Sequence, residues 1–380
     1  MNRTKTTLAA TIITGIVLAA CGGGDNEATP TTVDGVTTTT TTTEAAATTT
    51  ELVETAAATS TTTQPIVTST TIPDVLRMPL TGEPVEDASD IPDRPAIAVK
   101  MPVDRKAQPW SGLNQADIVF EAIINGGFTR LISMFHSQQA DPVGPIRSGR
   151  AQDVDVIAMF REPLVGWSGG NPSVTREMRR ADDELNVLID LNAVRGFSDL
   201  YYRRSGVADA PNNLYSSTEV LLTATPTEFA APTPVFTYLK PGEEVTGEPA
   251  TDIAVTLDAI SSEWEYDPET ERYFRSQNGL ESMTESGDTE ERVWADNVVV
   301  MSADYGVNPL DNNPDLVSRG SNPLLVFSRG TVREGVWIRF DIVDPFAFFN
   351  NLDELDAVGL VPGRTWVEFP RNEEGNIIYS

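Results

Sequence analysis

Three arginines lie close to glycines in a chain that is otherwise strongly acidic. Arg130 follows a Gly-Gly pair, and Arg147 and Arg150 flank Ser148 in the stretch "GPIRSGR". Guanidinium groups bind phosphate and carboxylate through paired, charge-assisted hydrogen bonds. Backbone N–H groups at the start of a helix add to such a site. The pattern predicts an anion site that contains Arg130, Arg147, Ser148 and Arg150.

Pairing with nearby acids is the alternative for these arginines, and the acids are Glu121, Asp153 and Asp155. Glu121 lies in a strand-like run where alternation places it on the same face as Val119 and Ile123. This predicts a partly buried carboxylate, which needs a partner, and Arg130 or Arg147 is the expected one. With this partner Glu121 is structural, whereas with a raised pKa it could act as an acid.

Gly169 and Gly170 form a second candidate element, in the stretch "GGNPSV" after a strand-like run. They indicate a tight turn. Because glycine has no side chain, such a turn also lets a ligand approach the backbone closely. This turn and the arginines both lie at expected strand-to-helix junctions, so we include Gly169 and Gly170 in the candidate site.

Cys21 is the only cysteine of the 380 residues and ends the stretch "LAAC". Arg3 and Lys5 precede a mostly apolar run from Thr6 to Ala20, which is a secretory signal pattern. The run is shorter than the roughly 20 apolar residues that a spanning helix needs, and an uncleaved anchor helix is the alternative. Leu18 to Cys21 resembles a bacterial lipobox. We expect cleavage before Cys21 and its acylation, by palmitate-type chains, since two chains give stable anchoring to the membrane.

Several kinds of chemistry are excluded by residue counts. A lipidated Cys21 leaves no cysteine for a disulfide, a cysteine-based zinc site or a thiol nucleophile. His136 is the single histidine, so a Ser-His-Asp enzyme would have to use it, and we expect it to be structural. A carboxylate Ca²⁺ loop is an open alternative, although a solvated loop is favoured; its residues are Asp304, Asp311, Asn312, Asn313 and Asp315. We expect no metal and no cofactor.

Charge and composition indicate which partners are excluded and which part of the chain does not fold. The formal net charge of −29 repels nucleic acid, so we expect no nucleic-acid partner. Residues 21–75 are rich in threonine, alanine and acids, and they cannot bury enough apolar surface to fold. We expect a disordered tether there, with an O-glycosylated stalk as the alternative.

The elements that must position the candidate residues fall into two regions. Strand-like and helix-like runs alternate in the first region, and we expect an α/β domain over residues 76–230. Ser148 is expected to cap a helix from about Gly149 to Phe160, and Ser173 another through Arg180. Short alternating runs separated by turn residues predict a smaller, mainly antiparallel β domain over residues 250–380. Residues 231–249 are the expected linker and residues 1–20 the signal peptide, so the fold class is α+β or mixed.

Several blocks of the sequence resemble a known family. The blocks are "RPAIAVKM", "QPWSGLNQADIVFEAIINGGFTRLISMFHS", "VGPIRSGRAQDVDVIAMF", "GGNPSV", and then "WEYDPETERYFRSQNG", "ADNVVVM" and "GRTWVEFP". Their order resembles the N- and C-terminal domains of the YerB-like bacterial lipoproteins, over roughly residues 90–370. This resemblance implies a two-domain lipoprotein outside the cytoplasm.

This sequence departs from the family pattern at three places where the resemblance implies frequent histidines. They are occupied by Trp167, Asn212 and Glu281. Any histidine-based chemistry of the family would therefore be altered here. We expect a lipid-anchored, non-catalytic binding or scaffolding protein of the cell envelope, with an anionic envelope group or an envelope protein as partner. An enzyme acting on phosphorylated or glycan envelope material by carboxylate and arginine chemistry is the alternative, and a structural spacer is a third.

Overall fold

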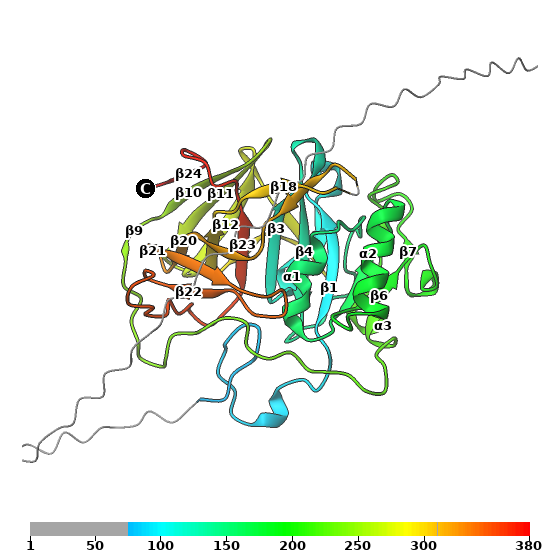
Figure 1. Ribbon diagram of the computed structural model, residues 1–380, viewed down its shortest axis with the longest axis horizontal. Coiled ribbons are helices and arrows are strands. Elements are labelled where there is room, and N and C mark those ends of the chain that lie inside the picture. Colours follow the sequence, from blue (N-terminus) through cyan, green and yellow to red (C-terminus); the bar gives the residue numbers. More distant parts are fainter. Residues whose placement is uncertain (1–74, 310) are drawn as a thin grey trace, which may run out of the picture. The chain divides into compact units, whose positions relative to one another are not determined.

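A mixed sheet of eleven strands forms the centre of the computed structural model, which describes residues 75–309 and 311–380 (Figure 1). Ten strands follow the order β22-β21-β20-β17-β23-β3-β4-β1-β5-β6, and β9 pairs with β21. The strands are β1 (Ile97–Pro102), β3 (Ile118–Ile123), β4 (Thr129–Phe135), β5 (Leu164–Trp167), β6 (Ile189–Asn192), β9 (Glu248–Pro249), β17 (Asn297–Met301), β20 (Gly320–Ser328), β21 (Thr331–Arg339), β22 (Ala347–Phe349) and β23 (Thr365–Phe369).

The two sequence regions meet inside this sheet. Strand β23, from the C-terminal region, lies between β17 and β3 and is parallel to both. Thr365 pairs with Ile118, and Phe369 pairs with Ala122. The described residues, 75–309 and 311–380, belong to one compact unit, and the strands of both regions share one continuous sheet. A division into domains at residues 231–249 stays a prediction.

Helices and loops cover one face of the large sheet. They include α1 (Asp153–Ile157), its 3-10 extension η5 (Ala158–Phe160) and α2 (Pro172–Asp183). Their apolar side chains pack on alternate residues of the sheet, such as Phe120, Ile132 and Val165. This alternation follows from the pleat of a strand, in which successive side chains point to opposite faces.

A second sheet packs against the other face, and its apolar side chains form one core cluster with Val119, Leu131 and Trp366 of the large sheet. It contains β10 (Asp252–Leu257), β11 (Ile260–Asp267), β12 (Arg272–Gln277), β13 (Leu280–Glu281), β16 (Trp294–Ala295) and β24 (Ile377–Tyr379). Helix α3 (Thr218–Leu222) packs on the same side, near β1 and β5.

Smaller elements complete the described fold. The remaining strands are β2 (Trp110–Ser111), β7 (Tyr202–Arg203), β8 (Leu214–Tyr215), β14 (Met283–Ser286), β15 (Thr289–Arg292), β18 (Tyr305–Val307) and β19 (Pro314–Leu316). The other 3-10 helices are η1 (Ala88–Asp90), η2 (Arg105–Ala107), η3 (Leu113–Gln115), η4 (Asn125–Gly127) and η6 (Ser198–Leu200).

The mixed fold class is confirmed in its coarse form, because the described residues are mostly sheet with few helices. The strand-like runs at residues 117–124, 130–135 and 164–167 are the strands β3, β4 and β5. An α/β arrangement of the N-terminal region is not confirmed and stays a prediction. In the part of the chain that the structure describes, no helix is both long and apolar enough to span a bilayer.

The expected linker is packed against the body of the protein. Val235, Phe236 and Leu239 are buried, and the Tyr238 hydroxyl donates a hydrogen bond of 2.6 Å to the Leu80 carbonyl. The segment is therefore a long connection that contributes to the core.

Candidate functional site

Apart from Glu121, the expected site residues lie near the carboxyl ends of the parallel strands of the large sheet. Strands β1, β5 and β6 are parallel, so their carboxyl ends lie together. Strand β4 is antiparallel to β1, and this places Arg130, near its start, opposite Pro102 at the end of β1. In open sheets with parallel strands, ligands commonly bind beyond the carboxyl ends.

Arg130 lies on β4, and Arg147 and Arg150 both lie on the loop before α1. The Arg147 N–H donates a hydrogen bond of 2.8 Å to the Lys100 carbonyl of β1, which fixes the "RSGR" segment beside that strand. Burial lowers the pKa of Arg130 to about 10, and repulsion from Arg147 and Arg150 adds to the shift. The three cationic side chains are therefore close enough to repel one another.

The guanidinium groups of the three arginines bond to neutral oxygens. Arg130 donates to the Thr129 carbonyl at 3.1 Å, and Arg147 donates to the Asn212 side chain. Arg150 donates to the Gly149 carbonyl at 2.9 Å and to Oδ1 of Asn125 at 3.0 Å. Within residues 75–309 and 311–380, none of the three forms an ion pair with a carboxylate.

Lys100 is a fourth cation of this region, and it was missed as a site residue. Its side chain is buried and lies 2.6 Å from Oδ1 of Asp153 on α1. Burial lowers its pKa to about 8, Asp153 opposes this shift, and Arg150 and Arg130 reinforce it. A lysine within the apolar run "RPAIAVKM" was the available signal, since a buried lysine needs a partner.

The Gly169-Gly170 turn lies against the "RSGR" segment. This proximity agrees with the expectation that both lie at strand-to-helix junctions. The Gly149 N–H donates a hydrogen bond of 3.1 Å to the Gly169 carbonyl, and Ser168 donates to the Arg147 carbonyl at 3.0 Å. Gly169 has a φ of +80°, which a glycine adopts readily. We call Arg130, Arg147, Arg150, Ser148 and the Gly169-Gly170 turn the arginine site.

Ser148 does not cap the following helix, so that prediction is wrong. Helix α1 begins at Asp153, after Gln152, whose side chain makes no capping bond. The backbone groups of Arg147 and Gly149 instead bond to Lys100 of β1 and to residues 168 and 169, and the helix begins only at Asp153. Ser148 is half-buried between the two arginines, and its hydroxyl bonds to no other residue among those described. It stays in the candidate site as a free hydroxyl.

The cap of α2 is also displaced from the expected residue. Asn171 is the N-cap, and its side chain accepts a hydrogen bond of 2.9 Å from the Val174 N–H. Pro172 follows at the first helical position, where its fixed φ fits. The Ser173 hydroxyl donates to the Asn171 side chain at 2.7 Å, so it supports the cap.

Glu121 is buried as predicted, but its expected partners are wrong. Arg275 of β12 lies 3.0 Å from Oε2 of Glu121, and both side chains are fully buried. The Thr129 hydroxyl donates to Oε1 at 2.6 Å. Arg130 pairs with Ala122 in the sheet register, which places it on the opposite face from Glu121. Glu121 therefore belongs to the core between the sheets and not to the arginine site.

A second buried glutamate lies beside this ion pair. Glu368 of β23 is directly opposite Glu121 in the parallel register. Its Oε1 accepts hydrogen bonds of 2.5 Å from the Ser262 hydroxyl and 3.0 Å from the Trp264 ring. Burial and then the charge of Glu121 raise the pKa of Glu368 to about 8, which Arg275 opposes. Glu368 is therefore mainly protonated at neutral pH.

Two of the three positions that depart from the family pattern lie at the arginine site. Asn212 accepts the hydrogen bond from Arg147. Trp167 packs under Gly149, where a Cβ would lie 2.7 Å from the indole ring. Glu281 lies elsewhere, 3.7 Å from Arg292. Asn212 and Trp167, which occupy positions that differ from the family pattern, therefore contact Arg147 and Gly149, respectively.

His136 and Asp117 occupy a buried corner away from this site. The backbone N–H of His136 donates a hydrogen bond of 2.6 Å to Oδ2 of Asp117. Burial and then the charge of Arg94 lower the pKa of His136 to about 4, so its ring is neutral at physiological pH. Burial raises the pKa of Asp117 to about 6, although hydrogen bonds from Ser137 and His136 oppose this.

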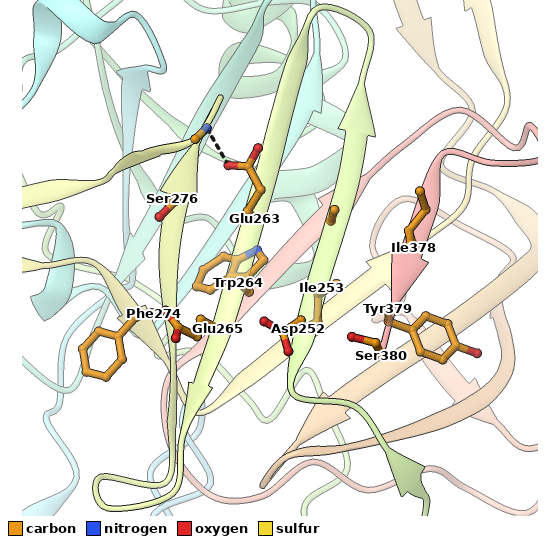
Figure 2. A pocket seen from close by; sticks show the side chains of 12 residues that line it. Asp252, Ile253, Glu263, Trp264, Glu265, Phe274, Ser276, Ile378, Tyr379 and Ser380 are labelled. Carbon is orange, nitrogen blue, oxygen red and sulfur yellow. Dashed lines mark hydrogen bonds between the residues drawn. The ribbon is translucent and has the colours of Figure 1, made fainter.

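A shallow acidic surface lies on the outer face of the second sheet (Figure 2). It spans a hollow of about 400 Å³ where Asp252, Glu263 and Glu265 come from β10 and β11. Trp264 alternates with these acids and is buried on the opposite face. In the loop considered as the alternative Ca²⁺ site, Asp311 accepts hydrogen bonds from Asn313 and from Asn171. No group of three metal-binding side chains occurs within the described ranges.

Comparisons with known proteins agree with this architecture. Residues 80–231 match the family described as "Protein of unknown function (DUF3048) N-terminal domain", and residues 253–367 match its C-terminal domain. The chain is 28% identical over 314 aligned positions to "Putative lipoprotein YerB" of Bacillus subtilis (strain 168), and the alignment covers 78% of this chain and 87% of that protein. It is also similar to the crystal structure of the YerB protein from Bacillus subtilis. That likeness has a TM-score of 0.65 and 25% identity, and it covers 80% of this chain and 99% of the other.

Both family segments are present in their order, and their strands join in the single large sheet described above. The resemblance expected from the sequence blocks is confirmed. This chain belongs to the YerB-like family with DUF3048 N- and C-terminal domains.

Proposed function

We propose that this protein is a lipid-anchored envelope protein, outside the cytoplasm, that binds an anionic group through the arginine site. The observation that carries the proposal is the convergence of Arg130, Arg147 and Arg150 without a carboxylate partner among the described residues. Holding like charges together costs free energy. A bound anion would offset that cost, and this favours a ligand over a purely structural role.

The arrangement of donors fits a phosphate or carboxylate group. Guanidinium groups with unused N–H donors suit tetrahedral or planar oxyanions, and each of the three arginine side chains donates at most two hydrogen bonds to protein oxygens in the described part. The free Ser148 hydroxyl adds one more donor. Lys100 is neutralised by Asp153, so it contributes less net charge than the arginines.

The anchoring part of the proposal depends on Cys21, which lies outside the described residues. The lipobox-like stretch and the similarity to a protein named as a lipoprotein support it. Two acyl chains on Cys21 would hold the protein at the membrane surface. The Thr-rich segment would then let the folded part reach ligands away from the bilayer.

An enzyme that uses carboxylates is the alternative, and two unpaired acids in one pocket would favour it. One polar hollow is lined by the acids Glu83, Asp117 and Asp296. Asp117 accepts hydrogen bonds from His136 and Ser137, Asp296 accepts one of 2.7 Å from the Arg364 N–H, and Glu83 accepts one of 3.2 Å from the Thr81 hydroxyl. Because all three acids already have donors, binding has more support than catalysis. Incubation with phosphate esters and envelope glycans, followed by product analysis, tests the alternative.

Titration calorimetry on the mature protein in an uncharged detergent tests the binding proposal. The probes are inorganic phosphate, sulfate and citrate. We expect binding that weakens with added salt, because screening reduces the attraction. Arg147→Gln with Arg150→Gln should weaken affinity by at least about tenfold, since hydrogen bonds to charged groups contribute on the order of 1.5–3 kcal/mol each.

A matched control keeps the change of charge but leaves the site intact. Arg161 and Lys240 are exposed, and Arg161 precedes the amino end of β5, at the opposite edge of the sheet. The double change Arg161→Gln with Lys240→Gln should leave anion affinity within about twofold. Absence of binding to all three anions, together with strong destabilisation of the Arg147 and Arg150 variant, would overturn the proposal.

A further inference from the structure

A second group of four arginines, together with Asp183 and Glu184, lines a hollow of about 530 Å³ beside helix α2. Arg176, Arg179 and Arg180 come from α2, and Arg195 comes from the loop after β6. All four side chains are exposed. Arg179 lies 3.5 Å from Asp183, and Arg180 lies 2.7 Å from Glu177.

Arg176 and Arg195 differ from the other two arginines of this hollow. Neither forms an ion pair with a carboxylate within residues 75–309 and 311–380. The chain contains 56 acidic and 27 basic side chains, so chance pairing would give most arginines an acid. Two unpaired arginines beside one hollow are a second attractive position for an anion.

The Gly169-Gly170 turn connects this hollow to the arginine site. On one side the Gly169 carbonyl accepts the hydrogen bond from the Gly149 N–H. On the other side the Thr175 hydroxyl, which lines the hollow, donates to the Gly170 carbonyl at 3.4 Å. A Cβ on Gly169 would lie only 2.6 Å from Val194, the neighbour of Arg195. The turn therefore contacts residues that neighbour both groups of arginines.

We infer that the ligand is a linear polymer with repeated phosphate groups, which occupies the arginine site and the α2 hollow at once. This inference rests on the proposed function and names the ligand class for the same site. A single phosphate can satisfy only one of the two positions. A chain of phosphates can bind both, and the second contact then forms at high effective concentration. Arginine suits such a ligand because its planar fork binds phosphate in a bidentate manner.

The glycine turn packs closely against residues next to both patches. Gly169 is buried, and a Cβ on Gly169 or Gly170 would collide with Val194 or Val174, so glycine permits this close packing. A flexible polymer with repeated phosphates could then follow a path that bridges the two patches. The bulk charge of the protein repels a polyanion elsewhere on the surface, which confines the polymer to this path.

Binding of phosphate chains of different length tests the inference on the mature protein in uncharged detergent. The probes are inorganic phosphate, tripolyphosphate and long-chain polyphosphate. For the wild type we expect affinity to rise steeply with chain length. Arg176→Gln with Arg195→Gln should weaken long-chain binding by about tenfold or more, while phosphate binding stays within about twofold. The salt dependence of long-chain binding should also become less steep.

The variants separate this inference from the proposed function. Arg147→Gln with Arg150→Gln should weaken binding of both the short and the long probes. The control pair Arg161→Gln with Lys240→Gln should change neither. If the Arg176 and Arg195 variant binds long chains as the wild type does, or if the control pair loses as much, the polymer inference is wrong although phosphate binding stands. If the wild type binds no phosphate probe, both proposals fail.

Discussion

Arg275 and Glu121 form an ion pair of 3.0 Å inside the protein, with both side chains fully buried. Glu121 belongs to the N-terminal family segment and Arg275 to the C-terminal one. The Arg275 guanidinium also lies over the Trp366 ring, 5.0 Å from its centroid, and donates to the Ser282 hydroxyl at 2.8 Å. This pair connects the large sheet to the second sheet across the core.

Replacing only one member of this pair should be strongly destabilising. Arg275→Met leaves Glu121 as a buried charge without its cation, and such changes cost about 3–5 kcal/mol. Urea unfolding followed by tryptophan fluorescence measures the loss. The double change Glu121→Gln with Arg275→Met should recover part of it. As a contrast, Arg180→Met removes the exposed pair with Glu177 and should cost less than about 1 kcal/mol. Equal losses for Arg275→Met and Arg180→Met would contradict the assignment.

Glu368 should make stability depend on pH. Its pKa is raised from 4.5 to about 8 in the folded protein, so the folded state binds a proton that the unfolded state has lost. Its stabilising contribution is complete below about pH 4.5 and is lost as the pH rises through about 8. Glu368→Gln should remove this dependence. The free energy of unfolding of this variant, minus that of the wild type, should increase between about pH 6.5 and pH 8.

This pH window avoids other groups with shifted pKa values. His136, with a pKa of about 4, and Asp117, with a pKa of about 6, titrate mainly below it. Lys100, with a pKa lowered from 10.5 to about 8, acts with the opposite sign and mostly above it. The charged groups that face Glu368 are Glu121 and Arg275. A difference between the two proteins that is flat across the window would refute a raised pKa for Glu368.

Gly149→Ala should disturb the arginine site through Trp167. The new Cβ would lie 2.7 Å from Cε3 of the indole and 3.1 Å from Cζ3, so the ring or the "RSGR" segment must shift. We expect a loss of about 1–3 kcal/mol and weaker phosphate binding, measured by thermal unfolding and calorimetry. Gly306→Ala is the matched control, because its Cβ would meet only the Asp315 carbonyl at 3.8 Å. Phosphate affinity that survives Gly149→Ala unchanged would separate Gly149 from the site.

Cys21→Ser should prevent lipidation. The protein should then leave the membrane fraction or keep its signal sequence, because the acyl chains supply the anchoring free energy. Membrane fractionation and mass spectrometry of the mature N-terminus measure both outcomes. An unmodified Cys21 on the wild-type protein in its own host would disprove the anchor.

Removal of residues before 75 should leave the free energy of unfolding unchanged, whereas removal of residues before 87 should lower it. The second truncation removes Leu80, which is 1% exposed, and the 2.9 Å hydrogen bond from Arg77 to the Leu239 carbonyl. Burial of one leucine contributes about 1.5–3 kcal/mol. Chemical unfolding of the two shortened chains and the full mature chain tests this. A large loss for the chain that starts at residue 75 would show that the Thr-rich segment packs on the fold.

Local signals in the sequence were sufficient for strands such as β3, β4 and β5 and for the proximity of Arg147, Arg150 and the Gly169 turn. Arg147 and Arg150 are three residues apart, and the Gly169 turn follows the next strand, so short connections keep them together. The cap at Ser148 could not be predicted, because the backbone of residues 147–149 bonds to β1 and the Gly169 turn, which are remote in sequence.

Long-range partners explain the other differences. The burial of Glu121 followed from strand alternation, but its partner Arg275 is far away in the sequence, and no local pattern identifies it. The hydrogen bonds of Glu368 with Ser262 and Trp264 also join residues that are far apart in the sequence. Charge pairs between sheets depend on the packing of the whole chain, whereas turns and strands depend mainly on neighbouring residues.

The place of β23 in the sheet has a consequence for the order of folding. Strand β3 is complete early in synthesis, but its parallel neighbour β23 is made near the end of the chain. Contacts between such distant segments slow folding, because a long loop must close first. Until residues 365–369 arrive, one edge of β3 has open N–H and carbonyl groups, and an open edge can pair with another chain. We therefore expect an incomplete chain of this protein to aggregate through β3. Efficient folding should require that synthesis has reached β23.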